Sequence, residues 1–75
     1  MDTEIRNLEL AIRSARTPQD FAAVDTALAA EHNSAMAACH GAVELQEVVQ
    51  TAVAEMDSLI IHSMDNLGVE FPEGY

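Results

Sequence analysis

The sequence has no tryptophan and no lysine, and it contains one cysteine, two prolines and three glycines. So few turn-forming residues disfavour a β sandwich or barrel, which needs many tight turns. With one Tyr and two Phe, the core must be built mainly from aliphatic residues and Met, which suits close packing of helices. Because Cys39 is the only cysteine, no intrachain disulfide can form, and we expect a reducing, cytoplasmic environment.

Long apolar runs are also absent, since no stretch approaches the roughly 20 residues that a membrane-spanning helix needs. Residues 1–4 lack the basic and apolar regions of a signal peptide. We therefore expect an intracellular protein that does not enter a membrane. A chain of 75 residues is expected to form one domain, and small domains without disulfides often gain stability by dimerising. The sequence thus predicts a homodimer.

Basic side chains are confined to Arg6, Arg13 and Arg16, whereas acidic residues occur along the whole chain and give a net charge of -10. Without a basic patch, the protein has no surface that could displace counterions from nucleic-acid phosphates. Direct nucleic-acid binding is therefore not expected. A protein partner with a basic surface is the complementary expectation.

Two amphipathic helices are predicted near residues 3–16 and 18–32. The first has one apolar stripe at helical spacing, formed by Ile5, Leu8, Ile12 and Ala15. At the start of the second, Thr17 is suited to cap the helix, Pro18 to its first position, and Asp20 to a capping box.

A longer helix is predicted over residues 35–67, where spacings of four and three alternate without interruption. This pattern is a heptad seam, and we expect it to serve as core and dimer contact through Val49, Val53, Met56, Ile60 and Leu67. The break before this helix is placed at Asn33-Ser34. An alternative, in which the second helix runs on to His40 and turns at Gly41, stays open.

The expected fold is therefore an all-α helical hairpin or three-helix bundle over residues 1–67, with one long C-terminal helix. Gly68 is the expected C-terminal cap of that helix. Residues 68–75 are expected to form an extended acidic tail. Phe71 favours a tail that folds back onto the bundle, since exposed aromatic side chains lower solubility.

No catalytic or metal-binding motif is evident. The soft or borderline metal ligands are His32, Cys39, His40 and His62, and the paired Glu-x-x-His motifs of helical metal proteins are missing. Cys39 falls on the heptad seam, which predicts burial as a small hydrophobic residue. Phosphate-binding glycine loops and Ser-His-Asp arrangements are absent as well. We therefore expect a protein that is not an enzyme and holds neither metal nor cofactor.

Two surfaces are candidates for binding a protein partner. The first is an acidic ridge opposite the seam, formed by Glu44, Glu47, Glu55, His62 and Asp65. The second is the tail, through Phe71 and Tyr75. The leading hypothesis is a non-enzymatic interaction module that binds and inhibits another intracellular protein. The alternatives are an acidic nucleic-acid mimic and a structural subunit of a larger assembly. Size and charge are typical of small adaptors, antitoxin-like neutralisers and phage-encoded inhibitors, which is an analogy of class only.

Overall fold

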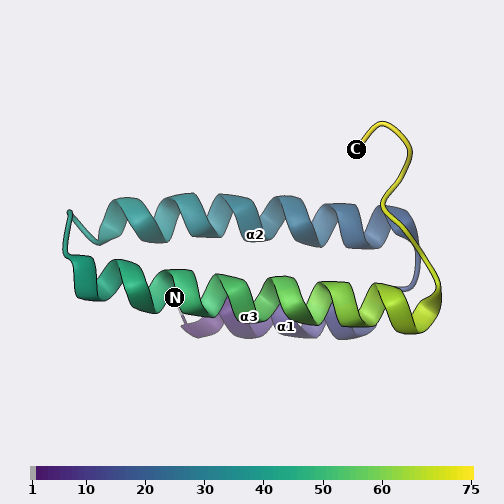
Figure 1. The fold of residues 1–75 in the computed structure, drawn as a ribbon, viewed down its shortest axis with the longest axis horizontal. Coiled ribbons are helices and arrows are strands. Elements are labelled where there is room, and N and C mark those ends of the chain that lie inside the picture. The colour runs from purple at the N-terminus through teal and green to yellow at the C-terminus, as the bar shows by residue number, and fades with distance from the viewer. Residues whose placement is uncertain (1) are drawn as a thin grey trace.

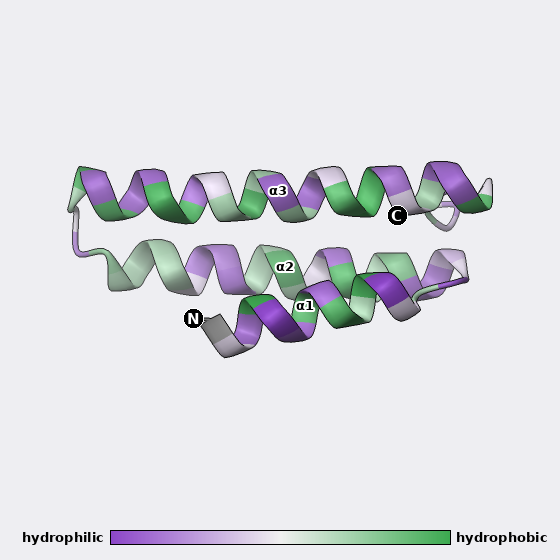
Figure 2. Ribbon diagram, turned by 90° about the horizontal axis from the view of Figure 1, so that it is seen from below, coloured by the Kyte–Doolittle hydropathy of each residue, from purple (hydrophilic) through white to green (hydrophobic). Residues whose placement is uncertain are grey.

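The computed structural model describes residues 2–75, which form a bundle of three α-helices (Figure 1). These are α1 (Asp2–Ser14), α2 (Pro18–Ala38) and α3 (Val43–Leu67). α2 and α3 form an antiparallel hairpin, and α1 packs against both of them (Figure 2). The bundle is elongated, with extents of 39 × 23 × 17 Å. The predicted all-α bundle, with its longest helix at the C-terminal end, is confirmed.

α2 begins with the capping box that the sequence predicts. The Asp20 backbone N–H donates to Thr17 Oγ1 at 3.1 Å, and the Thr17 backbone N–H donates to Asp20 Oδ2 at 3.2 Å. The Arg16 backbone N–H donates to the same carboxylate oxygen at 3.1 Å. These bonds, that from Arg16 first, lower the pKa of Asp20, because they stabilise the charged carboxylate. Helix α2 is therefore fixed in place directly after α1.

The predicted helix break at Asn33-Ser34 is wrong, and the alternative turn at Gly41 is right. α2 continues through residues 33–34 to Ala38, so it is longer than the predicted range 18–32. The chain then turns where His40 and Gly41 have φ values of 50° and 80°. This left-handed conformation is easily adopted by glycine and not by most other residues. The turn therefore lies where the backbone needs a glycine.

The reason for the longer α2 lies in its buried face. This face continues beyond the polar residues 33 and 34 and consists of Phe21, Val24, Leu28, Ala35 and, at the C-cap, Cys39. Asn33 and Ser34 are exposed residues within a continuous helix. Polar residues that face water do not end a helix whose apolar face still has a partner. The alternation of spacings of four and three continues from α2 through the turn into α3, and it therefore did not mark the turn.

α3 consequently begins at Val43, and the predicted helix over residues 35–67 is too long. Its buried residues are Val49, Met56, Ile60 and Met64. The last of these departs from the heptad seam, on which Val53 is half-buried and Leu67 is 44% exposed. A straight helix of 3.6 residues per turn drifts away from a seam of 3.5 in this way. The buried face therefore belongs to a globular bundle and not to a long coiled coil.

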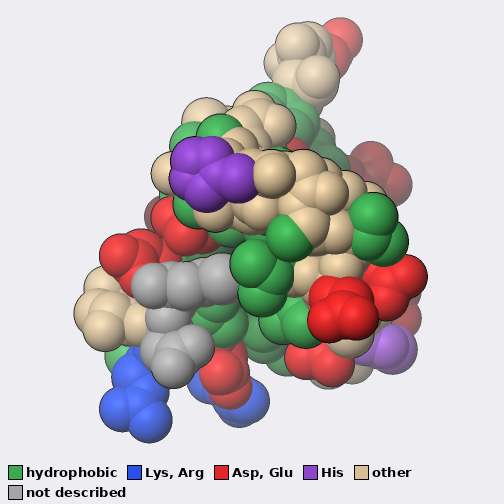
Figure 3. Space-filling model, turned by 90° about the vertical axis from the view of Figure 1, so that its left-hand side faces the viewer, with side chains coloured by type: hydrophobic (Ala, Val, Ile, Leu, Met, Phe, Trp, Pro, Cys, Tyr) green, Lys and Arg blue, Asp and Glu red, His purple; other side chains and the backbone are tan. Residues whose placement is uncertain are grey.

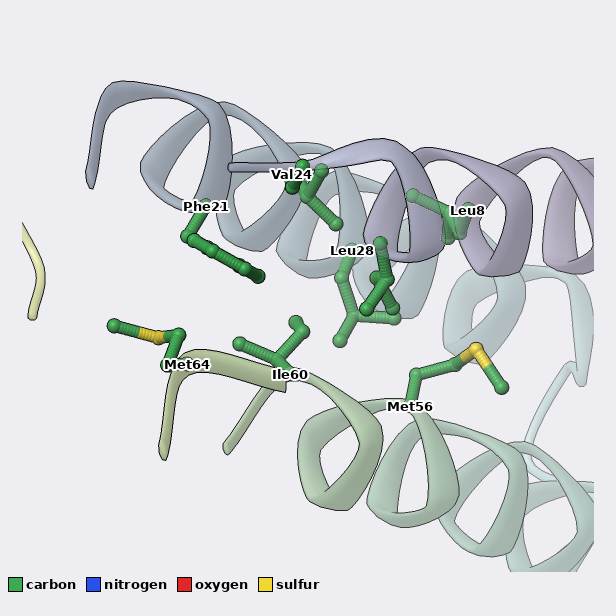
Figure 4. Packing of buried hydrophobic residues seen from close by; sticks show 9 residues of the cluster. Leu8, Phe21, Val24, Leu28, Met56, Ile60 and Met64 are labelled. Atoms are coloured by element: carbon green, nitrogen blue, oxygen red, sulfur yellow. The ribbon is translucent and has the colours of Figure 1, made fainter. Parts of the chain in front are cut away.

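The main core lies between the three helices, as Figure 4 shows. Phe21 of α2 points toward Ile60 and Met64 of α3, and its side chain is completely buried. Val49, Met56 and Ile60, which the sequence assigned to a joint core and dimer seam, are buried within a single chain. A homodimer would therefore have to use other surfaces, and it stays a prediction.

The C-terminal tail folds back onto α2. Gly68, with φ 67°, ends α3 in the left-handed conformation, as predicted. The Tyr75 hydroxyl donates to Asp25 Oδ2 at 2.6 Å and lies 3.3 Å from the carbonyl oxygen of Ala22. The rings of Phe71 and Tyr75 stack with centroids 4.9 Å apart. The return was predicted, but its hydrogen bonds to α2 come from Tyr75, on whose ring Phe71 stacks.

Candidate protein-binding surface

The acidic ridge lies on the outer face of α3. All five of its residues are exposed, and they are Glu44, Glu47, Glu55, His62 and Asp65. This face is opposite the one that carries the buried side chains of α3. Within residues 2–75, no ridge carboxylate forms an ion pair or a side-chain hydrogen bond. The ridge therefore presents negative charge that no neighbouring residue neutralises.

An apolar strip runs beside the ridge on α3. Leu45 and Val48 are 54% and 62% exposed, and Ala52 is half-buried next to them. Val48 and Ala52 share a shallow depression of about 400 Å³ with the ridge residues Glu44, Glu47 and Glu55. Leu45 and Ala52 lie seven residues apart and therefore on one side of the helix, whereas no sequence pattern indicated that Val48 is exposed. Apolar and acidic groups thus lie side by side on one face.

The apolar strip continues into a groove at the end of the bundle where α2 turns into α3. This end groove has a volume of about 420 Å³ and is lined by Glu4, Glu31, Ser34, Ala35, Ala38, Cys39, Leu45, Val48 and Val49. It exists because α1 reaches only part of the way along the hairpin, as Figure 2 shows. Figure 3 looks at this end of the molecule, where hydrophobic side chains lie next to acidic ones.

Small side chains make the floor of the end groove. Ala35, Cys39 and Val49 form a second, separate buried cluster, with Met36 and Val53 packed against it. The Cys39 thiol donates to the carbonyl oxygen of Ala35 at 3.2 Å. Its burial confirms the prediction that it packs as a small hydrophobic residue. Because Ala and Cys fill little space, the surface stays hollow between α2 and α3.

Arginine side chains do not line the end groove or the depression beside the ridge. Arg13 forms an ion pair at 2.9 Å with Glu9, which lies four residues before it on the same helix. Arg16 donates to the carbonyl oxygens of Arg13 and Ala15 at the end of α1. The guanidinium groups of both arginines therefore bind neighbouring groups at the C-terminal end of α1.

The tail residues lie at the other end of the bundle from the end groove (Figure 1). Phe71 is 38% exposed and Tyr75 is 57% exposed. Since Tyr75 is tied to α2, the tail forms a surface of its own, separate from the end groove. The structure therefore does not bring the two predicted binding surfaces together into one site.

The contact between Tyr75 and Asp25 predicts an unusual titration. The Asp25 carboxylate accepts the phenolic hydrogen bond and raises the pKa of Tyr75 above its ordinary value. A raised pKa means that this contact stabilises the fold below the ordinary tyrosine pKa, and that the stabilisation is lost as pH rises through the raised value. We expect tyrosinate absorbance, which reports only Tyr75 here, to appear at a higher pH than in the Asp25→Asn variant. Coincident titration curves would contradict the contact.

No group of three or more His, Cys, Asp or Glu side chains within residues 2–75 is arranged to hold a metal ion. In the same part of the chain, no helix combines the length and the apolar character needed to cross a membrane. Comparisons with known protein families, curated proteins and solved structures found no match. The geometry of the chain itself is thus the basis for a functional proposal.

Proposed function

We propose that this protein is a non-enzymatic interaction module that binds another cytoplasmic protein and inhibits it. The observation that carries the proposal is the combination of the acidic ridge with the apolar strip of Leu45, Val48 and Ala52 beside it. Apolar contacts supply affinity, while uncompensated carboxylates select a basic partner and speed its approach. Inhibition follows if the basic surface that the ridge covers is the surface through which the partner performs its own function.

A second candidate function is mimicry of nucleic acid. In its favour, the ridge carboxylates follow one another along one helix without a basic neighbour, as phosphates follow one another along a strand. A mimic would occupy a DNA-binding or RNA-binding groove of its target. A third role, that of a structural subunit in a larger assembly, would use the same exposed apolar strip.

Capture of partners from lysate tests the proposal, with wild type compared with the ridge variant Glu44→Gln/Glu47→Gln/Glu55→Gln. The control variant Asp57→Asn/Glu70→Gln/Glu73→Gln removes the same charge from exposed positions outside the ridge. We expect wild type and control to capture one specific protein, and the ridge variant to lose about tenfold in affinity for it. The loss should shrink at high salt, because salt screens exposed charges.

The other outcomes separate the alternatives. Release of the captured protein by added duplex DNA would favour nucleic-acid mimicry. Equal losses in the ridge and control variants would show that net charge alone mediates the contact, which would contradict a ridge-specific site. Absence of any specific partner at low and at high salt would overturn the proposal.

A further inference from the structure

The end groove is the part of the hairpin surface that α1 leaves uncovered. Along its own length, α1 places Leu8 and Ile12 in the core between α2 and α3. Beyond the start of α1, no helix of residues 2–75 continues this line (Figure 2), and Ala35 and Val49 line the groove there. One part of the hairpin therefore has a third helix, and the other lacks one.

We propose that the end groove binds an amphipathic helix of the partner protein, which carries an apolar stripe flanked by Lys or Arg. This inference rests on the proposed function and names its docking site. The partner helix would continue the line of α1 and complete the third position of the bundle. An amphipathic helix in an apolar groove is a common mode of protein recognition.

The dimensions of the end groove suit about two turns of helix. Its lining on α2 extends from Glu31 to Cys39, which corresponds to roughly 12 Å at 1.5 Å per residue. A helix over this length presents anchors at i, i+3 or i+4, and i+7. The small side chains of Ala35 and Ala38 leave space for larger anchors such as Leu or Met. The partner therefore supplies the bulk that the floor lacks.

The charges around the groove specify basic flanks on the partner. Glu31 lines the groove on α2, and Glu44 lies on the other side of Val48 on α3. Lys or Arg at the edges of a bound helix would meet these two carboxylates. A neutral helix would leave these carboxylates without a partner, and an acidic helix would be repelled by them.

A second copy of this chain is a poor occupant. Each copy has a net charge of -10, and all basic residues apart from histidine lie on or directly after α1. The apolar stripe of α1 is already buried in its own chain through Leu8 and Ile12. A second copy therefore offers no free basic helix, whereas its acidic helices would meet like charges at Glu31 and Glu44.

A displayed library of helix-forming peptides of about 15 residues, randomised on all faces, is the probe for this site. Selection on the full chain should recover peptides with one apolar stripe and Lys or Arg beside it. The Kd of a recovered peptide is then measured against paired variants. We expect Leu45→Asn/Val48→Asn to weaken binding at least about tenfold, since it removes the apolar anchors.

The matched control is Leu10→Asn/Ile61→Asn, which changes the same kind of residue at similar exposure outside the groove. Leu10 and Ile61 are 56% and 65% exposed, against 54% and 62% for Leu45 and Val48. This control should bind like wild type. Glu31→Gln/Glu44→Gln should weaken binding about tenfold at low salt and much less at high salt.

Three results would overturn the inference. The first is the recovery of no peptide, or of peptides without basic residues. The second is a Kd that changes equally in the groove variant and its control. The third is self-association in sedimentation that Leu45→Asn/Val48→Asn abolishes, which would make a second copy the occupant. The proposed function would survive these failures if the partner captured from lysate still depended on the acidic ridge.

Discussion

Replacing Phe21 by Ala should remove a large part of the protein's unfolding free energy. Phe21 is completely buried and points toward Ile60 and Met64 in the main core (Figure 4). Removing a buried phenylalanine costs about 3 to 5 kcal/mol of unfolding free energy, through lost burial and the cavity that remains. A domain of this size is stable by only about 4 to 11 kcal/mol in total. Urea unfolding followed by circular dichroism measures the loss.

Phe71→Ala is the matched control, because it removes the same side chain from a position that is 38% exposed. The ring of Phe71 stacks on Tyr75, and we expect its removal to cost about 1 kcal/mol or less. If both variants lost equal stability, the core would not be centred on Phe21.

Replacing Ile12 by Ala should release α1 from the hairpin. Ile12 is 1% exposed, and removal of three carbons from such a site costs about 2 to 4 kcal/mol. Because α1 has only 13 residues, it cannot persist as a helix without its partners. We expect amide hydrogen exchange to show a loss of protection over Asp2–Ser14 that exceeds the loss in α2 and α3.

Leu10→Ala provides the comparison within the same helix. Leu10 is 56% exposed, so its truncation should change stability by no more than about 0.5 kcal/mol. Uniform loss of protection across all three helices in Ile12→Ala would show instead that the bundle unfolds only as a unit. Selective release of α1 would expose the surface of the α2–α3 hairpin that α1 covers, next to the end groove.

Much of the fold could be predicted because local chemistry determines it. The Thr17 cap, Pro18 and Asp20 fix the start of α2, and Gly68 fixes the end of α3. Each of these signals acts within a few residues of its own position. The stripe of Leu8 and Ile12 on α1 was equally readable, since helical spacing alone defines it.

The turn between α2 and α3 was harder to place, because two signals competed. Asn33-Ser34 has the composition of a helix end, and yet Ala35 and Cys39 continue the buried face of α2. Sequence spacing cannot tell which helix a small apolar residue belongs to when its pattern persists through a turn. Gly41 decided the outcome, since it adopts a positive φ there.

The end groove could not be predicted from the sequence for a related reason. It depends on the difference in length between α1 and the hairpin, with 13 residues in α1 and 21 and 25 in α2 and α3. With the second helix ended at residue 32, no uncovered hairpin end would have been expected. The acidic ridge, by contrast, needed only helical periodicity.

The placement of the arginines gives the molecule an electric dipole. Arg13 and Arg16 lie at the end of α1, while the ridge carboxylates occupy the outer face of α3. A particle with such a dipole turns in the field of a charged body before the two surfaces touch. A basic target would thus turn α3 toward itself while the two proteins diffuse together. A larger share of their collisions would then lead to binding.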